Sequence, residues 1–404
     1  MMCISNKYNY LRLFTMLLLA LYPILYSYMS SYNLNYGEIG LGLATAFGMI
    51  HYGMKDGLVF PSKYLYFWIY VSITLIITSN SFKFTYLIPG GIAFSLFSLN
   101  WAFSSRVFHL DSLYKCMKIV FFIAVLVYIA QLLHLMPNQY QYIAVFPISD
   151  HIAYADIDYQ GLMNLREGTI RPCSLFLEPA YFAQYALIFL ALEMFYKTDI
   201  DRLLTPISFI TIIVLLLLRS GLGFCGLIVL LSIKCYDYLK KSRNGWMTLL
   251  LIAPVLIYFL SLFLVSEAGV ELMERKSEFQ TEGSSGFLRI VQGFLIFDAL
   301  PLFHKLFGIS MESVAAMQLP FFTYTSTGEV SLFTNGFCTV LIKTGLMGLL
   351  LLLFVYYKMF KNGSMLSKTL VILLLVMSMI EQVYLTSSML LCSVIANSET
   401  TKSK

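Results

Sequence analysis

Apolar runs of about 20 residues recur along the whole chain, and they restrict its fold more than any other feature. A helix needs roughly 20 apolar residues to cross a bilayer core about 30 Å thick. Lipid offers the backbone no hydrogen-bonding partner, so such runs cross a membrane as helices. The candidate spans are 11–29, 37–54, 64–80, 85–103, 117–136, 174–196, 203–218, 221–237, 247–266, 336–357 and 369–389. The sequence therefore predicts an all-α, polytopic integral membrane protein with about 11–12 transmembrane helices.

The low content of charged residues indicates one integral membrane domain over residues 1–404. Hydrophobic residues make up 59% of the chain and charged residues 12%, whereas soluble domains carry about 25% charged residues. The basic and apolar start of the chain has no A-x-A cleavage site, which predicts a retained first span rather than a removed signal peptide. The apolar tail 387–398 is short, so it is either a re-entrant end or a twelfth span.

The distribution of Lys and Arg predicts the orientation in the membrane. If the N-terminus is cytoplasmic, the cytoplasmic segments hold about twice as many basic residues as the outer ones, as the positive-inside rule requires. This predicts a multi-pass protein with a cytoplasmic N-terminus and large outer loops at 137–173 and 267–335. Within the second loop, residues 286–308 are amphipathic and are expected to lie along the membrane surface. The net charge of +5 follows from topology and predicts no nucleic-acid partner.

Metal-binding and disulfide patterns are not found in the sequence. The seven cysteines are scattered and form no CxxC pair. Asp150, His151, Asp156 and Asp158 follow no standard ligand spacing. The sequence therefore predicts neither a metal site nor a cofactor.

The segment RPCSLFLEPAYFAQY, residues 171–185, places charged residues at the start of an apolar run. A helix beginning at Arg171 and Pro172 would carry Ser174 and Glu178 on the same face, with Arg171 and Glu178 about 10 Å apart. Pro179 would then kink that helix. Ionisable groups at membrane depth usually face a cavity or a partner. The alternative is a topological arginine beside a neutralised carboxylate.

Two further arginines are expected on the outer side. Arg219 occupies a tight reversal between two spans, where it could also simply snorkel to the interface. Arg289 lies on the amphipathic stretch, where it could be an ordinary polar-face residue. Because arginine binds phosphate oxygens with two parallel hydrogen bonds, Arg171, Arg219 and Arg289 together favour an anionic lipid head such as a lipid-linked pyrophosphate.

These segments resemble the O-antigen and capsule repeat-unit polymerases, often called Wzy. The stretch 171–190 is similar to their signature region of arginine, small residue, aromatic, Glu-Pro and Phe-Ala. The matching residues are Arg171, Ser174, Phe176, Glu178, Pro179, Phe182 and Ala183. The stretches 218–231, 288–308 and 335–354 resemble a short Ser/Arg-Gly break, an Arg-led outer helix ending at a glycine, and a late Asn-Gly and Gly-x-x-Gly span.

The resemblance implies a GT-C-like glycosyltransferase of the bacterial cytoplasmic (inner) membrane. It would use polyprenyl-pyrophosphate-linked oligosaccharides and make O-antigen, capsular polysaccharide or exopolysaccharide. Arg171 would bind the pyrophosphate with Ser174, and Arg219 and Arg289 would be further clamps. Glu178 would orient Arg171 or act as the base. Neither metal nor cofactor is needed in this scheme. The expected partners are the lipid-linked oligosaccharide and membrane lipids, with a chain-length regulator and a flippase as further ones.

Two alternatives stay open. An O-antigen ligase has the same fold and donor but another acceptor. Ligases place a histidine ahead of a glycine pattern, which His304 and Gly308 match poorly, so a polymerase is favoured. A flippase or transporter would be expected to show internal repeats and charges at mid-bilayer, whereas here the charges gather at the outer rim.

Overall fold

The computed structural model is almost entirely helical. It describes residues 2–26, 28–29, 36–44, parts of 66–77, 108–135, 151–152, 172–197 except 177, 204–241, 254, 261, 287–309 and 334–402 except 385. The predicted span 85–103, and most of 37–54, 64–80 and 247–266, lie outside these residues. So do Arg171 and most of the two predicted outer loops.

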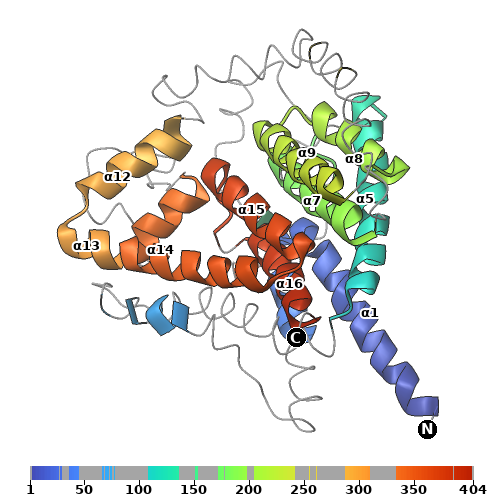
Figure 1. The fold of residues 1–404 in the computed structure, drawn as a ribbon, viewed down its shortest axis with the longest axis horizontal. Coiled ribbons are helices and arrows are strands. Elements are labelled where there is room, and N and C mark those ends of the chain that lie inside the picture. The colour runs from blue at the N-terminus through green and yellow to red at the C-terminus, as the bar shows by residue number, and fades with distance from the viewer. Residues whose placement is uncertain are drawn as a thin grey trace.

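The long helices form a bundle, and a group of shorter elements lies beside it (Figure 1). The bundle helices are α1 (Met2–Leu25), α5 (Leu110–Leu132), α7 (Pro179–Leu192), α8 (Pro206–Leu217), α9 (Gly221–Lys241), α14 (Gly336–Asn362), α15 (Met365–Ile380) and α16 (Ser387–Lys402). The π-helix η2 (Glu193–Lys197) continues α7 within the bundle. The shorter elements beside it are the π-helix η4 (Phe287–Gln292) and the helices α12 (Gly293–Ala299) and α13 (Leu302–Phe307). Two strands, β1 (Tyr28–Met29) and β2 (His151–Ile152), pair antiparallel.

The helices have the length and composition expected of a membrane protein. Among the described residues, α5, α9 and α14 are long and apolar enough to cross a bilayer. Shorter apolar helical segments are the C-terminal half of α1 (Leu13–Leu25), the N-terminal part of α16 (Ser387–Ala396) and the whole of α8 and α15. The prediction of an all-α polytopic membrane protein is therefore confirmed.

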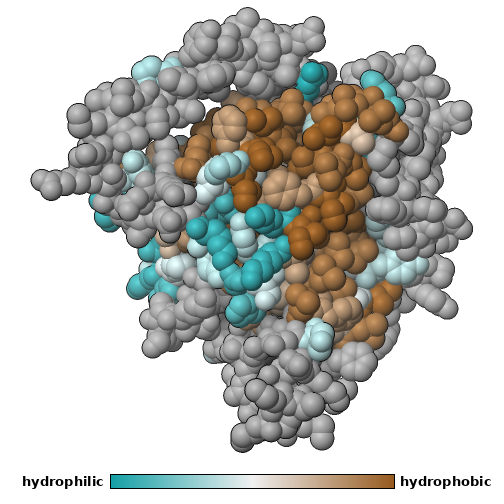
Figure 2. Space-filling view, turned by 90° about the vertical axis from the view of Figure 1, so that its right-hand side faces the viewer, coloured by the Kyte–Doolittle hydropathy of each residue, from teal (hydrophilic) through white to brown (hydrophobic). Residues whose placement is uncertain are grey.

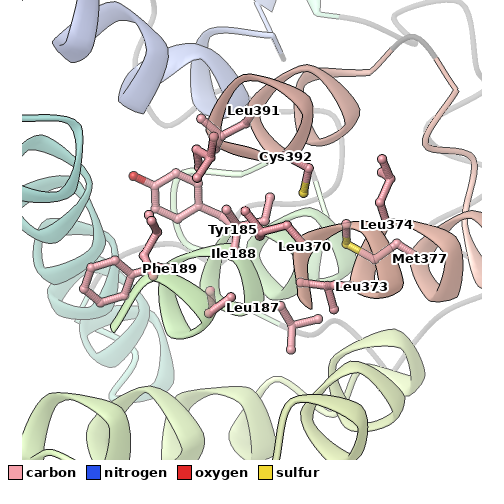
Figure 3. Close-up of a cluster of buried hydrophobic side chains, with 14 of the residues drawn as sticks. Tyr185, Leu187, Ile188, Phe189, Leu370, Leu373, Leu374, Met377, Leu391 and Cys392 are labelled. Carbon is pink, nitrogen blue, oxygen red and sulfur yellow. The ribbon is translucent and has the colours of Figure 1, made fainter. Parts of the chain in front are cut away.

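Helix α7 forms the centre of the bundle. Its residues are apolar on every side, which is typical of a helix surrounded by others, and its side chains from Phe182 to Leu192 are buried. Figure 3 shows α7 side chains facing Leu370 and Leu373 of α15 and Leu391 and Cys392 of α16. Helix α9 packs closely because Gly226 has no side chain: a Cβ there would lie 2.4 Å from Leu187 Cδ1.

The outer faces of α5 and α8 are apolar. Figure 2 shows this surface as a broad brown area. Its exposed side chains include Ile119, Ile123 and Leu126 of α5 and Phe209 and Ile213 of α8. A contiguous apolar surface of this kind marks an interaction with another apolar phase, which for a bundle of apolar helices is the lipid of the bilayer.

The end of the chain differs from the predicted span 369–389. Helix α15 ends at Ile380, and a separate helix α16 begins at Ser387, so the single span is wrong. The hydroxyl of Ser367 in α15 donates to the carbonyl of Ala396 at 2.9 Å, which makes α15 and α16 an antiparallel hairpin. The tail is thus a buried helix that runs back along the bundle.

Candidate active site

The segment 172–178 is fixed to α5. The Ser174 backbone has φ +60°, and its N–H donates to Gln131 Oε1 at 2.8 Å. The Ser174 hydroxyl donates to the Ala124 carbonyl at 2.5 Å. Because this side chain is completely buried, its hydroxyl is committed to α5 and fixes the approach of the segment to the bundle.

The helix predicted to begin at Arg171 and Pro172 is therefore wrong, and it begins at Pro179 instead. Proline fits the first helical position because its missing N–H would have no partner there. Pro179 thus starts the helix rather than kinking it, since the preceding turn is held open by Ser174.

Glu178 lies at the N-cap of α7. Its backbone is extended, its side chain is half-buried and its carboxylate makes no capping hydrogen bond. Among the described residues, none is seen to hydrogen-bond or ion-pair with this carboxylate. Burial, together with the nearby Glu178 charge, raises the pKa of Cys173 to about 12. The thiol therefore stays protonated at neutral pH.

Arg219 lies at the predicted reversal between α8 and α9, which is confirmed. Its backbone has φ +48°, and its side chain is exposed. The Tyr128 hydroxyl donates to the Leu217 carbonyl at 2.8 Å, which attaches the reversal to α5. The Tyr128 ring also packs edge-on against Phe182 near the start of α7. Arg219 therefore lies at the end of the bundle where α7 begins.

Arg289 lies on η4 and forms an ion pair with Glu381, at the C-cap of α15. Both side chains are partly buried, with 18% and 14% of their surface exposed. The sequence analysis missed Glu381, although it is an acidic residue that interrupts the predicted span 369–389. Its partner is remote in sequence, and only the fold brings the two together.

The two backbones of this ion pair are held by one dipeptide at the start of α14. The Asn335 N–H donates to the Arg289 carbonyl at 2.8 Å, and the Gly336 N–H donates to the Glu381 carbonyl at 2.8 Å. The Asn335 side chain accepts from Cys338 N at 2.8 Å and donates to the Met379 carbonyl at 3.0 Å. The Asn-Gly motif thus joins η4, α14 and α15.

Two glycines of the motif stretches, Gly308 and Gly345, lie where two backbone segments make direct contact. Gly308 after α13 has φ +81°, and Gly345, where α14 bends, has φ +67°. A Cβ on Gly345 would lie 2.3 Å from the Leu306 carbonyl oxygen, and one on Gly308 would lie 2.3 Å from that of Lys343. The Tyr70 hydroxyl donates to the Thr344 carbonyl at 2.7 Å. In Figure 1 the two arms of α14 meet beside α13.

The predicted surface stretch 286–308 is therefore broken into η4, α12 and α13. Pro301 separates the two α-helices. Ile296 and Leu300 of this stretch pack with Ile309 and with Ile342 of α14, while Phe294 and Leu302 are exposed. The buried side chains of this stretch pack against α14.

Glu178, Arg219 and the Arg289–Glu381 pair lie at the same end of the bundle. The Ser388 hydroxyl donates to Gln184 Oε1 at 2.5 Å, so the start of α16 adjoins the first turns of α7. The loop from Glu381 to this point therefore reaches the end where Glu178 lies. Arg171, the remaining predicted site residue, falls outside the described residues.

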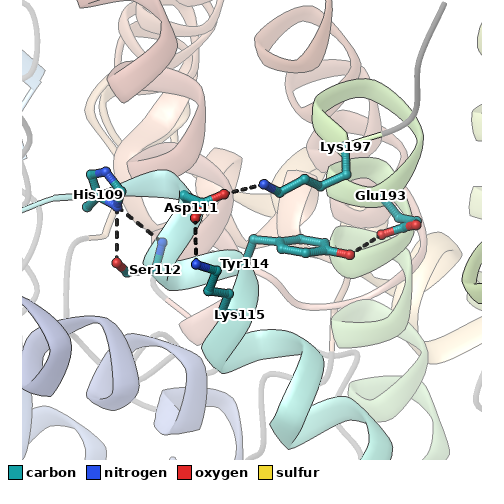
Figure 4. Close-up of polar contacts among 7 residues, drawn as sticks. All are labelled: His109, Asp111, Ser112, Tyr114, Lys115, Glu193 and Lys197. Atoms are coloured by element: carbon teal, nitrogen blue, oxygen red, sulfur yellow. Dashed lines mark hydrogen bonds and ion pairs between the residues drawn. The ribbon is translucent and has the colours of Figure 1, made fainter.

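The opposite end holds a different polar group, the Asp111–Lys197 cluster (Figure 4). Asp111 pairs with Lys197 and, at 3.1 Å, with Lys115. The Tyr114 hydroxyl donates to Glu193, and the Thr205 hydroxyl donates to Glu193 Oε1 at 2.7 Å. These contacts satisfy a buried carboxylate on η2 and fix the ends of α5, α7 and α8 together.

In the part of the chain that the structure describes, no group of three or more His, Cys, Asp or Glu residues could hold a metal ion. Of the acidic segment 150–158, only residues 151–152 are described. Metal independence therefore stays a prediction.

The described helices form a membrane bundle that brings the Glu-Pro segment, the arginine reversal and the Asn-Gly span towards one end. A family model described as WcaD colanic acid polymerase matches residues 85–396, which is most of the chain. The chain belongs to this family. No curated protein matches it.

Membership in this family confirms the resemblance to repeat-unit polymerases. The protein is a membrane-bound, glycosyltransferase-type polymerase that joins repeat units into exopolysaccharide. Neither the ligase nor the flippase alternative is favoured.

Proposed function

We propose that the protein joins polyprenyl-pyrophosphate-linked oligosaccharides at the outer face of the bacterial cytoplasmic membrane, with its N-terminus in the cytoplasm. The observation that carries this proposal is the gathering of Glu178, Arg219 and Arg289 at one end of the bundle. The positive-inside rule predicts that this end faces the outside of the cytoplasmic membrane, because the basic residues gather at the opposite end. A flippase would supply the lipid-linked units, and a chain-length regulator would act on the product.

In this reaction the growing chain is the donor and a new lipid-linked unit is the acceptor. Glu178 accepts the proton of the acceptor hydroxyl, and the oxygen of that hydroxyl forms a bond to the anomeric carbon of the donor. The bond from that carbon to the pyrophosphate breaks, and the electron pair stays on the pyrophosphate. Because this leaving group is already a stable anion, it needs cationic stabilisation rather than protonation.

The arginines provide that stabilisation. Arg171, Arg219 and Arg289 hold the pyrophosphate oxygens through charge-assisted hydrogen bonds. Ser174 does not contact the substrate in this scheme, because its hydroxyl already donates to the Ala124 carbonyl. Its role is to fix the segment that positions Glu178. The donor leaves from its lipid end, so the chain grows by insertion at that end.

The test is a reconstitution of the purified protein with lipid-linked repeat units alone, without nucleotide sugar, a second lipid or added metal. The wild type should form a ladder, and a chelator should not inhibit it. Glu178→Gln should leave single units. Arg171→Lys should fail nearly as badly as Arg171→Ala, since a point charge cannot replace a planar fork.

The matched control is Asp298→Asn, because Asp298 is an exposed carboxylate of α12 that pairs with Lys305. This variant should form normal ladders. Full ladders from Glu178→Gln at normal protein level would refute the proposed base. Full activity of Arg171→Lys would refute two-point binding of the pyrophosphate by Arg171.

A further inference from the structure

Arg289 has a carboxylate partner in the structure, so an arriving anion competes with that partner for the guanidinium. The ion pair with Glu381 engages Nη1 of the guanidinium in a partly buried junction of η4, α14 and α15. We propose that Glu381 is a positioning residue that exchanges with the substrate pyrophosphate for Arg289. This inference rests on the proposed function, because it takes the pyrophosphate as the anion that Arg289 binds.

The junction allows this exchange without movement of the helices. Asn335 and Gly336 hold the backbone carbonyls of Arg289 and Glu381, each at 2.8 Å. These hydrogen bonds fix where both side chains begin and leave the side-chain torsions as the moving parts. The charge pair can therefore open while the junction stays closed.

The helix dipoles around the ion pair favour a bound pyrophosphate over the Glu381 carboxylate as the partner of Arg289. Glu381 is the C-cap of α15, where the helix dipole disfavours negative charge. The N-terminus of α14, capped by Asn335, lies beside the same pair, and it favours negative charge. The start of α14 stabilises either anion, but only the Glu381 carboxylate is attached to the unfavourable C-terminus of α15, so the field opposes the carboxylate more than a pyrophosphate bound on the α14 side.

The exchange affects binding and release in opposite ways. A ligand that must first displace Glu381 binds with an apparent affinity reduced by the fraction of open pairs. When the lipid pyrophosphate leaves, Glu381 returns to Arg289 and prevents immediate rebinding. Glu381 therefore weakens donor binding and speeds product release.

The experiment measures binding of polyprenyl pyrophosphate to the purified full-length chain in lipid nanodiscs. Glu381→Gln should bind this probe about tenfold more tightly than the wild type, which corresponds to an open-pair population of about one tenth. In the ladder assay, the same variant should lower the donor KM and also lower kcat, because product leaves more slowly. A purely structural role would loosen the junction and weaken binding, so unchanged or weaker binding overturns the exchange.

Loss of Glu381 leaves the Arg289 charge partly buried, which can lower stability. Two additional measurements keep the proposal testable. The probe should raise the unfolding temperature of Glu381→Gln more than that of the wild type. Glu381→Asp, which keeps the charge, should restore an affinity close to that of the wild type, and failure of either result overturns the exchange.

The controls separate this inference from the proposed function. Asp298→Asn removes a carboxylate from the neighbouring helix and should bind the probe like the wild type. If Arg289→Ala weakens binding but Glu381→Gln does not tighten it, the exchange is wrong and the proposed pyrophosphate site stands. If the wild type does not bind the probe and Arg289→Ala changes nothing, the proposed function is wrong, and the exchange falls with it.

Discussion

Substitution of Gly345 by alanine tests whether the bend of α14 depends on direct contact between two backbones. Gly345 has φ +67° and ψ −175°, a region that is almost confined to glycine and costs other residues about 1–3 kcal/mol. The added Cβ would lie 2.3 Å from the Leu306 carbonyl oxygen and 2.6 Å from Gly308 N. Overpacking of this kind costs about 1–3 kcal/mol more. Gly345→Ala should therefore destabilise the fold by about 2–6 kcal/mol.

The assay is thermal unfolding of the purified protein in detergent. The measured quantity is the fraction of protein that stays monodisperse after heating to each temperature. The matched control is Gly221→Ala at the start of α9, where a Cβ would meet no atom within 4 Å. Gly345→Ala should unfold at a clearly lower temperature, and Gly221→Ala should be close to the wild type. Equal unfolding temperatures for Gly345→Ala and the wild type would refute the close approach of α13 and α14.

Two further predictions concern Ser174 and the orientation of the bundle. Ser174→Ala removes the hydrogen bond to the Ala124 carbonyl and should lower the free energy of unfolding by about 1 kcal/mol. The folded variant should still form ladders. Loss of ladders at full stability would instead show that Ser174 contacts the substrate. Reporter fusions after Gly283 should read outside and those after Lys241 inside, and an inside signal at Gly283 would place the proposed site in the wrong compartment.

Hydropathy was sufficient to predict the helical class and several elements. The runs 117–136, 221–237 and 336–357 correspond to α5, α9 and α14, because a long apolar run has few alternatives to a helix in lipid. The reversal at Arg219 was also predicted, since two apolar runs separated by a three-residue break must turn there. Function followed from motif resemblance, which family membership confirmed.

The start of α7 could not be predicted from the local sequence. Pro172 and Pro179 are both suited to a first helical position, and local rules favoured the earlier one. The choice is made by contacts with α5, where Gln131 and Ala124 bind Ser174 in a left-handed conformation. Such tertiary contacts override local preference.

The candidate site was predicted in part, for a similar reason. Glu178 and Arg219 were identified because charges are rare beside apolar runs. The partner of Arg289 was missed because Glu381 lies in another helix, and no spacing rule relates residues so far apart. The commitment of Ser174 to α5 was equally invisible, since its motif position is the same whether it binds substrate or backbone.

The bend at Gly345 also resolves a mismatch between the length of α14 and the thickness of the membrane. As a straight helix, Gly336–Asn362 would be about 40 Å long, whereas the hydrocarbon core is about 30 Å thick. The arm 346–362 alone is about 25 Å long, which suits the core with little tilt. The arm 336–344 is then free to take its direction from α13 rather than from the bilayer. The orientation of the arm 336–344, and with it the position of the Arg289–Glu381 ion pair, is accordingly set by contacts inside the protein. It should persist in bilayers of different thickness.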